Sequence, residues 1–187
     1  MKIVCQIGVK YYFETTNLKR KIRPVNRLDK DTSGIVIFAK NEYIQEALIR
    51  QMKSNHFKKE YIAFLDGIVE ETIGTIEAPI LRKEGSIIER EISKKGNMAI
   101  SHFEVLKRYD DYTKVKYTLE TGRTHQLRVH SKFIGHPILG DSLYGKPSIK
   151  INRQALHAYK ITFIHPISSK EIILETDLPD DMKLLNK

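Results

Sequence analysis

An acidic side chain that could act as a catalytic carboxylate stands in the segment Pro24–Gly34. Arg27 and Lys30 flank this acid, Asp29, and turn-forming residues then lead into the apolar run Ile35–Ala39. Such a run predicts a buried strand, and catalytic side chains are often carried on loops that a rigid strand holds in place. A solvated loop charge explains the same local pattern, so only the rest of the sequence can decide.

A second polar segment, Leu119–His130, gathers two arginines, two histidines and a glutamine around the expected start of a helix. Thr124 is the predicted N-cap, and Gly135 followed by Pro137 predicts the end of the helix. The free amides of a helix N-terminus and the guanidinium groups of arginine both bind anions. A polar helix face whose arginines pair with surface acids is the alternative, so a phosphate or carboxylate contact stays open here.

The sequence carries no motif for metal or nucleotide binding. His125 and His130 are five residues apart, about 140° around a helix, so they do not share a face as metal ligands. There is no H-E-x-x-H cluster, no G-x-x-x-x-G-K-[ST] loop and no G-x-G-x-x-G turn, and no serine stands in a G-x-S-x-G turn. We therefore expect no metal site, and a Ser-His-Asp triad is disfavoured.

The composition is that of one soluble globular domain with a polyanionic partner. The chain has 187 residues, of which 41% are hydrophobic and 29% charged. Its formal charge is +9 and its pI about 9.5. Because lysine and arginine release counterions when they contact phosphates, nucleic acid is the favoured partner. An anionic membrane is disfavoured, since the basic residues are scattered and no long helix opposes a basic face to an apolar one.

The cysteine content and the start of the chain bear on location. Cys5 is the single cysteine, which excludes an intramolecular disulfide and favours a reducing compartment. The start Met1–Gln6 is too short an apolar run for a signal peptide, and no stretch is long enough to span a bilayer. We expect a cytoplasmic protein, with no membrane partner and a monomer as the default.

The elements that must position these side chains show helix and strand patterns in turn. Asn41 is the expected N-cap of a helix with apolar residues at helical spacing, and residues 82–97 predict an exposed hairpin or mobile loop. Strand formers dominate 60–69, 99–107, 113–120, 159–164 and 171–176, with a hairpin between the second and third of these and a short helix from Pro179. This order predicts an α+β fold with a largely antiparallel or mixed sheet.

Taken in order, these segments resemble the RluA/RluD-type family of RNA pseudouridine synthases. The family's H-R-L-D-x-x-T-S-G motif is matched by N-R-L-D-K-D-T-S-G at 26–34, and K-x-Y-x-A is present at 59–63. G-R-T-H-Q-[IL]-R-x-H stands at 122–130 and is followed by G-H-P-[IV]-x-G-D-x-x-Y-G at 135–145. Two further family motifs match at 156–166 and 179–185, so the resemblance covers residues 24–187.

The resemblance implies a catalytic fold with a central mixed, largely antiparallel sheet flanked by helices. It also implies conversion of uridine to pseudouridine in rRNA or tRNA without a metal or an organic cofactor. By motif position, Asp29 would be the catalytic aspartate, Tyr61 the aromatic residue against the target base, and Arg128 the arginine that pairs with the aspartate. The residues that would bind the RNA or the uridine are Arg27, which is implied in flipping the base, Leu156 in the pocket wall, and Asn26, Arg123, His125 and Gln126.

Physical chemistry agrees with these roles. The uracil must leave the base stack before its glycosidic bond can be broken, and an aromatic surface repays part of that cost. An aspartate can attack the anomeric carbon or remove a sugar proton, and the sequence does not choose between them. Both roles need an ionised carboxylate, which an arginine nearby would favour.

The chain departs from the family pattern at two places. Asn26 stands where the family has histidine, so this position cannot become a cation. Residues 1–23 contain no N-K-P-x-G turn, which predicts an atypical, shortened N-terminus and no separate accessory RNA-binding domain. We expect one catalytic domain over 1–187. It is either a shortened version, with a strand at Val9–Thr15 rebuilding the sheet edge, or a damaged one.

Two rival functions stay open. A protein that binds RNA or assists its folding, with turnover lost, would keep the basic cleft, and the atypical N-terminus is its main support. A hydrolase of nucleosides or small phosphates has no motif of its own. The intact Asp29, Tyr61 and Arg128 favour the enzyme.

Overall fold

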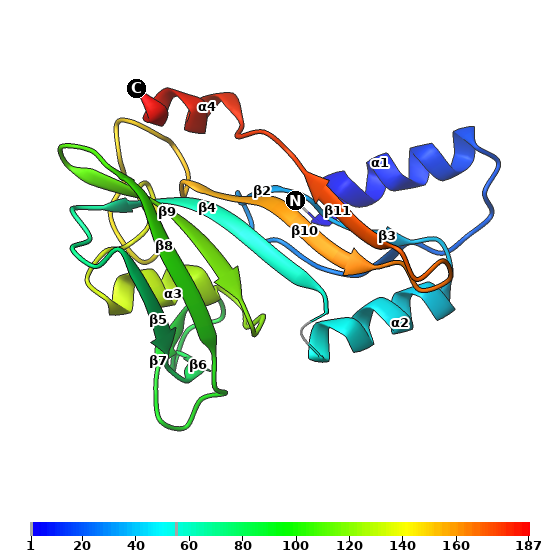
Figure 1. Cartoon of the computed structure of the whole chain (residues 1–187), viewed down its shortest axis with the longest axis horizontal. Coiled ribbons are helices and arrows are strands. Elements are labelled where there is room, and N and C mark those ends of the chain that lie inside the picture. The colour runs from blue at the N-terminus through cyan, green and yellow to red at the C-terminus, as the bar shows by residue number, and fades with distance from the viewer. Residues whose placement is uncertain (1, 55) are drawn as a thin grey trace.

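The fold is organised around one large sheet in a computed structural model that describes residues 2–54 and 56–187 (Figure 1). Within these residues, seven strands form the sheet, in the order β11-β10-β4-β9-β8-β5, and β2 pairs with β10 beside this path. The strands are β2 (Ser33–Gly34), β4 (Lys58–Asp66), β5 (Ile73–Glu77), β8 (Ile100–Arg108), β9 (Tyr112–Leu119), β10 (Leu156–Ile164) and β11 (Glu171–Glu175). All pairs are antiparallel except β2–β10, which confirms the expected α+β fold with a mixed, largely antiparallel sheet.

Two short strand pairs lie outside this sheet. The first joins β1 (Arg23–Pro24) to β3 (Phe38–Ala39), and the second joins β6 (Ile80–Arg82) to β7 (Arg90–Ile92). The β6–β7 pair confirms the hairpin expected over 82–97, although its first strand begins two residues earlier, at Ile80.

The continuous buried strand expected over Ile35–Ala39 is wrong, because only β2 and β3 are strands here. Gly34 has a φ of +117°, and a Cβ at this position would clash with the backbone of Ala158. The chain therefore turns at Gly34 to pass β10 closely, and Ile35–Ile37 leave the sheet.

The helices are α1 (Lys2–Thr15), α2 (Glu42–Lys53), α3 (Gln126–Phe133) and α4 (Asp180–Lys183), followed by the 3-10 turn η1 (Leu184–Asn186). Asn41 caps α2 as expected, since its Oδ1 accepts a bond of 2.9 Å from the amide of Ile44. The strand expected at Val9–Thr15 is wrong, because these residues lie in α1. The N-cap expected at Thr124 is wrong by one residue, since the N-cap position of α3 is His125, which is left-handed with a φ of 58° and makes no side-chain capping bond.

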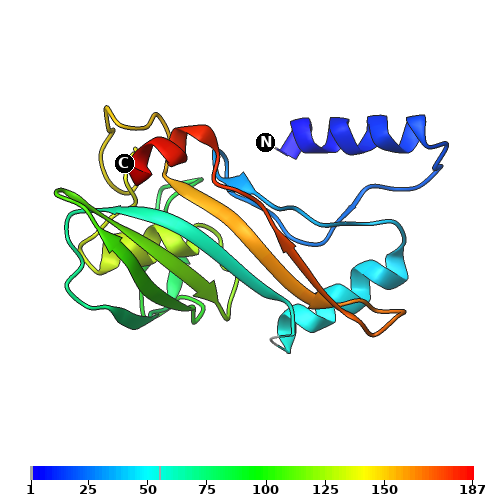
Figure 2. The ribbon, with the colours of Figure 1, turned by 45° about the horizontal axis from the view of Figure 1, so that its top comes forward.

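Helices α2 and α3 pack on the same face of the sheet, α2 against β10 and α3 against β9. Ile161 of β10 packs in one cluster with Leu48 of α2, and Tyr117 of β9 bonds to Ser131 of α3 at 2.8 Å. Register places Ile161 beside Lys59 and Tyr117 beside Tyr61 on β4, so all four side chains share one face. This leaves a stretch of β4 between the two helices, while α4 lies beside the beginning of β10, away from α2 (Figure 2).

Candidate active site

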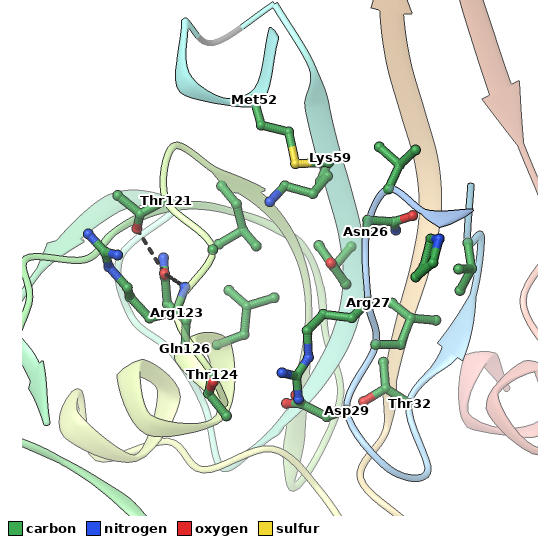
Figure 3. A pocket seen from close by; sticks show the side chains of 18 of the residues that line it. Asn26, Arg27, Asp29, Thr32, Met52, Lys59, Thr121, Arg123, Thr124 and Gln126 are labelled. Atoms are coloured by element: carbon green, nitrogen blue, oxygen red, sulfur yellow. Dashed lines mark hydrogen bonds between the residues drawn. The ribbon is translucent and has the colours of Figure 1, made fainter. Parts of the chain in front are cut away.

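A cavity of about 720 Å³ occupies that stretch of β4 between α2 and α3. One wall is the loop 24–36, the opposite wall is the segment 119–127, and β4 forms the floor (Figure 3). Apolar side chains make up much of the lining, together with two acids and several cations; those used below are Arg27, Asp29, Lys59, Tyr61, Glu120, Arg123, Gln126 and Leu156. A cavity of this size and mixed character suits an aromatic base attached to an anionic backbone.

The backbone around Asp29 is held by the segment that precedes β10. Gln154 Nε2 donates to the carbonyl of Lys30 at 2.5 Å and to the hydroxyl of Thr32 at 3.1 Å. Arg153 Nη1 donates to the carbonyl of Asp31 at 3.1 Å, and Asp31 has a φ of 66°, which is unusual for a residue other than glycine. These bonds cross more than 120 residues of sequence and fix the turn immediately after Asp29.

The far end of the same loop is also anchored to β10. Ser33 Oγ and His157 Nδ1 are 2.8 Å apart, and the amide of Ile35 donates to the carbonyl of Ala158 at 2.9 Å. Arg153 itself is fixed by Asp181 of α4 through two bonds of 2.8 and 2.9 Å. The position of Asp29 therefore depends on contacts that reach the C-terminal helix.

Asn26 holds the loop from inside. Its Nδ2 donates to the carbonyl of Ile35 at 3.1 Å, and its Oδ1 accepts from the amide of Ile37 at 2.7 Å. Both polar ends of the amide are thus used by the protein, and the side chain is buried. The geometry supports orientation of the loop by this residue rather than direct contact with RNA.

The Asp29 carboxylate is half-buried and, among the described residues, accepts no hydrogen bond and forms no ion pair. Its charge nevertheless affects the pKa of three neighbours, Tyr61, His125 and Arg128. Burial raises the pKa of Tyr61 and the charge of Asp29 adds to that rise, so the phenol stays protonated at neutral pH. Burial lowers the pKa of His125, and Asp29 acts in the opposite direction.

The expected pairing of Arg128 with Asp29 is wrong in this structure, because Arg128 pairs with Asp141. Arg128 Nε and Nη2 donate to the two carboxylate oxygens of Asp141 at 2.6 and 2.7 Å, and the pair is buried. Burial alone would lower the pKa of Arg128, but bonding to Asp141 raises it, and Asp29 contributes in the same direction. Asp29 therefore lies within electrostatic reach of Arg128 without a direct bond.

The partner of Arg128 comes from the turn that follows α3. Asp141 also accepts from the amides of Leu143 and Tyr144 at 3.0 and 3.1 Å, so four donors hold this carboxylate. The ring of Tyr144 lies 4.9 Å from the guanidinium carbon of Arg128. Tyr144 and His125 are 2.7 Å apart at the hydroxyl and Nδ1, so His125 is turned toward this cluster and does not line the cavity.

Gln126 is predicted to contact RNA, but both polar atoms of its side chain form hydrogen bonds within the protein. Its Oε1 accepts from Thr121 at 2.8 Å and from the amide of Arg123 at 2.9 Å. Its Nε2 donates to the carbonyl of Ile100 and the hydroxyl of Ser101, both at 2.9 Å. Gln126 therefore shapes the cavity wall by fixing the 121–123 loop, as Figure 3 shows.

The remaining predicted residues reach the cavity in different ways. Arg27 and Arg123 are exposed and line it from opposite walls (Figure 3). Arg123 Nε donates to the carbonyl of Met98 at 3.1 Å. Leu156 is buried at the beginning of β10, and Tyr61 is buried on β4. Tyr61, Leu156, Asp29 and Asn26 thus meet at one cavity although they come from distant segments.

Sequence reasoning missed Gln154, Arg153, Asp141 and Lys59. Asp141 lies inside the matched motif at 135–145. The available signal was an acidic residue in a motif close to Arg128, which could have been considered as its partner. Gln154 and Arg153 precede the motif at 156–166, and no local pattern marks the bonds that they send to the Asp29 loop.

The described residues contain neither a metal-binding cluster nor a membrane-spanning helix. No three His, Cys, Asp or Glu side chains in 2–54 and 56–187 gather as a metal site would require. No helix in the same ranges is both long and apolar enough to cross a membrane.

The chain is similar to known RNA pseudouridine synthases. The family model described as RNA pseudouridylate synthase matches residues 5–132. The uncharacterised RNA pseudouridine synthase YjbO of Bacillus subtilis is 42% identical over 180 residues, which cover 96% of this chain and 64% of the relative. Ribosomal large subunit pseudouridine synthase D of Nitrosomonas europaea is 39% identical over 170 residues, covering 86% of this chain and 49% of the relative.

The chain thus spans less than two thirds of the length of either relative. Among solved structures, human RNA pseudouridylate synthase domain containing 1 matches with a TM-score of 0.72 and 28% identity. That match covers 84% of this chain and 69% of the human chain.

Proposed function

The chain belongs to the RNA pseudouridylate synthase family, and from that premise we propose that it converts uridine in RNA to pseudouridine. The observation that carries the proposal is the Asp29 carboxylate at the cavity. It lies within electrostatic reach of Tyr61 and has no bonded counter-ion among the described residues. A carboxylate of this kind is available to a substrate, whereas a paired one would first have to be released.

Each step of the reaction has a residue suited to it. The uridine leaves its stack and enters the cavity, where the Tyr61 ring and Leu156 give the uracil an apolar surface. Asp29 then acts on the ribose, either by bonding to the anomeric carbon or by removing a sugar proton. The bond from that carbon to N1 of uracil breaks and the base turns. C5 then bonds to the anomeric carbon, while the bond to Asp29 breaks in the first route or the sugar proton returns from Asp29 in the second. C5 loses its proton and N1 gains one, so the product is an isomer of the substrate.

The arginines have separate tasks in this proposal. Arg27 is exposed at the cavity, where its guanidinium can fill the gap left by the flipped base. Arg128 is held by Asp141, and the charge of Asp29 helps to raise the pKa of Arg128 without a bond between the two side chains. This assigns Arg128 a positioning and electrostatic role and leaves the Asp29 oxygens free.

RNA is the proposed partner, and the formal charge of +9 supports it. One relative is named a ribosomal large subunit pseudouridine synthase, so we propose rRNA as the first substrate to test and tRNA as the second. We further propose that the described residues act as one catalytic domain, in the cytoplasm and as a monomer. Support for one domain comes from a single sheet that joins strands between Ser33 and Glu175. An RNA-binding protein without turnover is not favoured.

The experiment that tests this function uses unmodified transcripts of rRNA and tRNA from the host. The protein is incubated with each RNA, and pseudouridine is mapped position by position. We expect product at one or a few uridines with the wild-type protein and none with Asp29→Asn, while both proteins bind the RNA. If the wild-type protein binds RNA and yet modifies no uridine, the proposed activity is overturned.

A further inference from the structure

Lys59 lies on the cavity floor beside the residue that would face the base. It stands two positions before Tyr61 on β4, and side chains two apart on a strand project from the same face. Both line the cavity, and Figure 3 places Lys59 at the end near Met52, away from Asp29. Two residues along a strand span about 7 Å, so Lys59 lies about that distance from Tyr61 along β4, next to the proposed position of the base.

This lysine carries a charge that the protein leaves without a partner. In the described part of the chain, Lys59 Nζ has neither a hydrogen-bond acceptor nor a carboxylate within ion-pair distance, and burial lowers its pKa. Two nearby acids, Glu60 and Glu120, are occupied elsewhere. Glu60 projects from the opposite face toward Tyr159, and Glu120 bonds His102 at 2.6 Å.

Gly122 in the opposite wall leaves space at the ammonium group. A Cβ at Gly122 would lie 3.0 Å from Lys59 Nζ, so the ammonium rests directly against this backbone. Because glycine has no side chain there, the charge stays open to the cavity between β4 and the 121–123 loop. Arg123 follows Gly122 and brings a second cation to the same wall.

From this arrangement we infer that Lys59 binds a backbone phosphate of the RNA next to the flipped uridine. The inference rests on the proposed function and names a contact within the same site. A half-buried ammonium without a carboxylate is costly unless an anion joins it, and phosphates are the anions of RNA. Asp29 does not fill this role, since its charge affects the pKa of Tyr61, His125 and Arg128 whereas the pKa of Lys59 is lowered by burial. Uracil offers only neutral carbonyl oxygens.

The chain provides a matched control in Lys58. This residue has the same charge and the same strand, but it is exposed and projects from the opposite face of β4, as alternation along a strand requires. Lys58→Met and Lys59→Met therefore remove the same charge from opposite sides of one strand.

The test measures RNA affinity as a function of salt for the wild-type protein and both variants. The probe is the unmodified transcript on which the wild-type protein forms pseudouridine, or a large-subunit rRNA transcript if no product is found. For Lys59→Met, we expect the slope of log affinity against log salt to become shallower by about 0.7–0.9. The affinity loss at 0.1 M salt is then about five- to eightfold greater than at 1 M. Lys58→Met leaves the slope unchanged.

Lys59→Arg provides the second readout, because it keeps the charge at every pH. Phosphate binding favours the protonated form of Lys59, so wild-type affinity should decline between about pH 7 and pH 10 more steeply than that of Lys59→Arg. An unchanged slope for Lys59→Met overturns the inference, whether affinity falls or not, because a base contact or a packing role releases no counterion. Equal slope changes for the two methionine variants also overturn it. Binding is measured apart from turnover, so failure of the modification assay leaves this result readable.

Discussion

Two aspartates near Arg128 have opposite surroundings. Asp141, in the turn after α3, is fully buried and accepts four hydrogen bonds, from two atoms of Arg128 and from the amides of Leu143 and Tyr144. Asp29, on the loop before β2, is half-buried and has no bonded partner among the described residues, although its loop backbone is clamped. A carboxylate held by four donors stabilises a fold, whereas one held only through its backbone can react. Asp141 therefore belongs to the structural part of the site, and Asp29 to the part that carries out the proposed chemistry.

The largest expected effect comes from replacing each of these two acids in turn by asparagine. Asp141→Asn leaves the Arg128 charge buried without its counter-ion and should lower the free energy of unfolding by about 3–5 kcal/mol. Asp29→Asn removes no bond and should change that free energy by less than about 0.5 kcal/mol while abolishing pseudouridine formation. Urea unfolding and the modification assay on the same preparations measure both quantities. Similar stability losses in the two variants would break the comparison.

The clamp on the Asp29 loop should give the next largest effect. Gln154→Leu leaves the carbonyl of Lys30 and the hydroxyl of Thr32 without their donor and should cost about 1–3 kcal/mol of stability. Because the loop carries Asp29, kcat should fall while RNA affinity stays near the wild-type value. Gln45→Leu is the matched control, since Gln45 Nε2 donates to the carbonyl of Pro24 at 2.9 Å in an exposed bond. A loss of affinity with unchanged kcat would argue against positioning of Asp29 by this clamp.

The effect that is smallest near neutral pH comes from the histidines packed beside the two regions. Burial lowers the pKa of His130 behind α3 and of His157 beside the Asp29 loop below the ordinary value of 6.5. The unfolded chain then binds protons that the native state does not, so stability is fully present above pH 6.5 and falls as the pH drops toward the native pKa values. Each histidine adds up to about 1.4 kcal/mol per pH unit. Urea unfolding from pH 7.5 to 5 should show this slope, and His130→Gln should reduce it; an unchanged slope would exclude His130 as a source.

Local sequence predicted the parts of the fold that depend on neighbouring residues. Asn41 caps α2 because its side chain reaches an amide three residues along the chain. The hairpin of β8 and β9 follows from two strand patterns around Asp110 and Asp111. Where local pattern failed, a tertiary contact decided instead: the apolar run Ile35–Ala39 reads as one strand, but the close approach of Gly34 to Ala158 turns it out of the sheet.

The sequence by itself determined the family, the sheet class and the residues Asp29, Tyr61 and Leu156 that meet at the cavity, because ordered motifs and strand periodicity are written along the chain. Only the tertiary structure decided which partner each charge has. Arg128 binds Asp141 and not Asp29, and Gln154 holds a loop more than 120 residues away. Lys59 faces the cavity while Lys58 faces away. Hydrogen bonds and ion pairs depend on distances of a few ångströms between segments remote in sequence, and those distances are set by how the sheet and its helices pack.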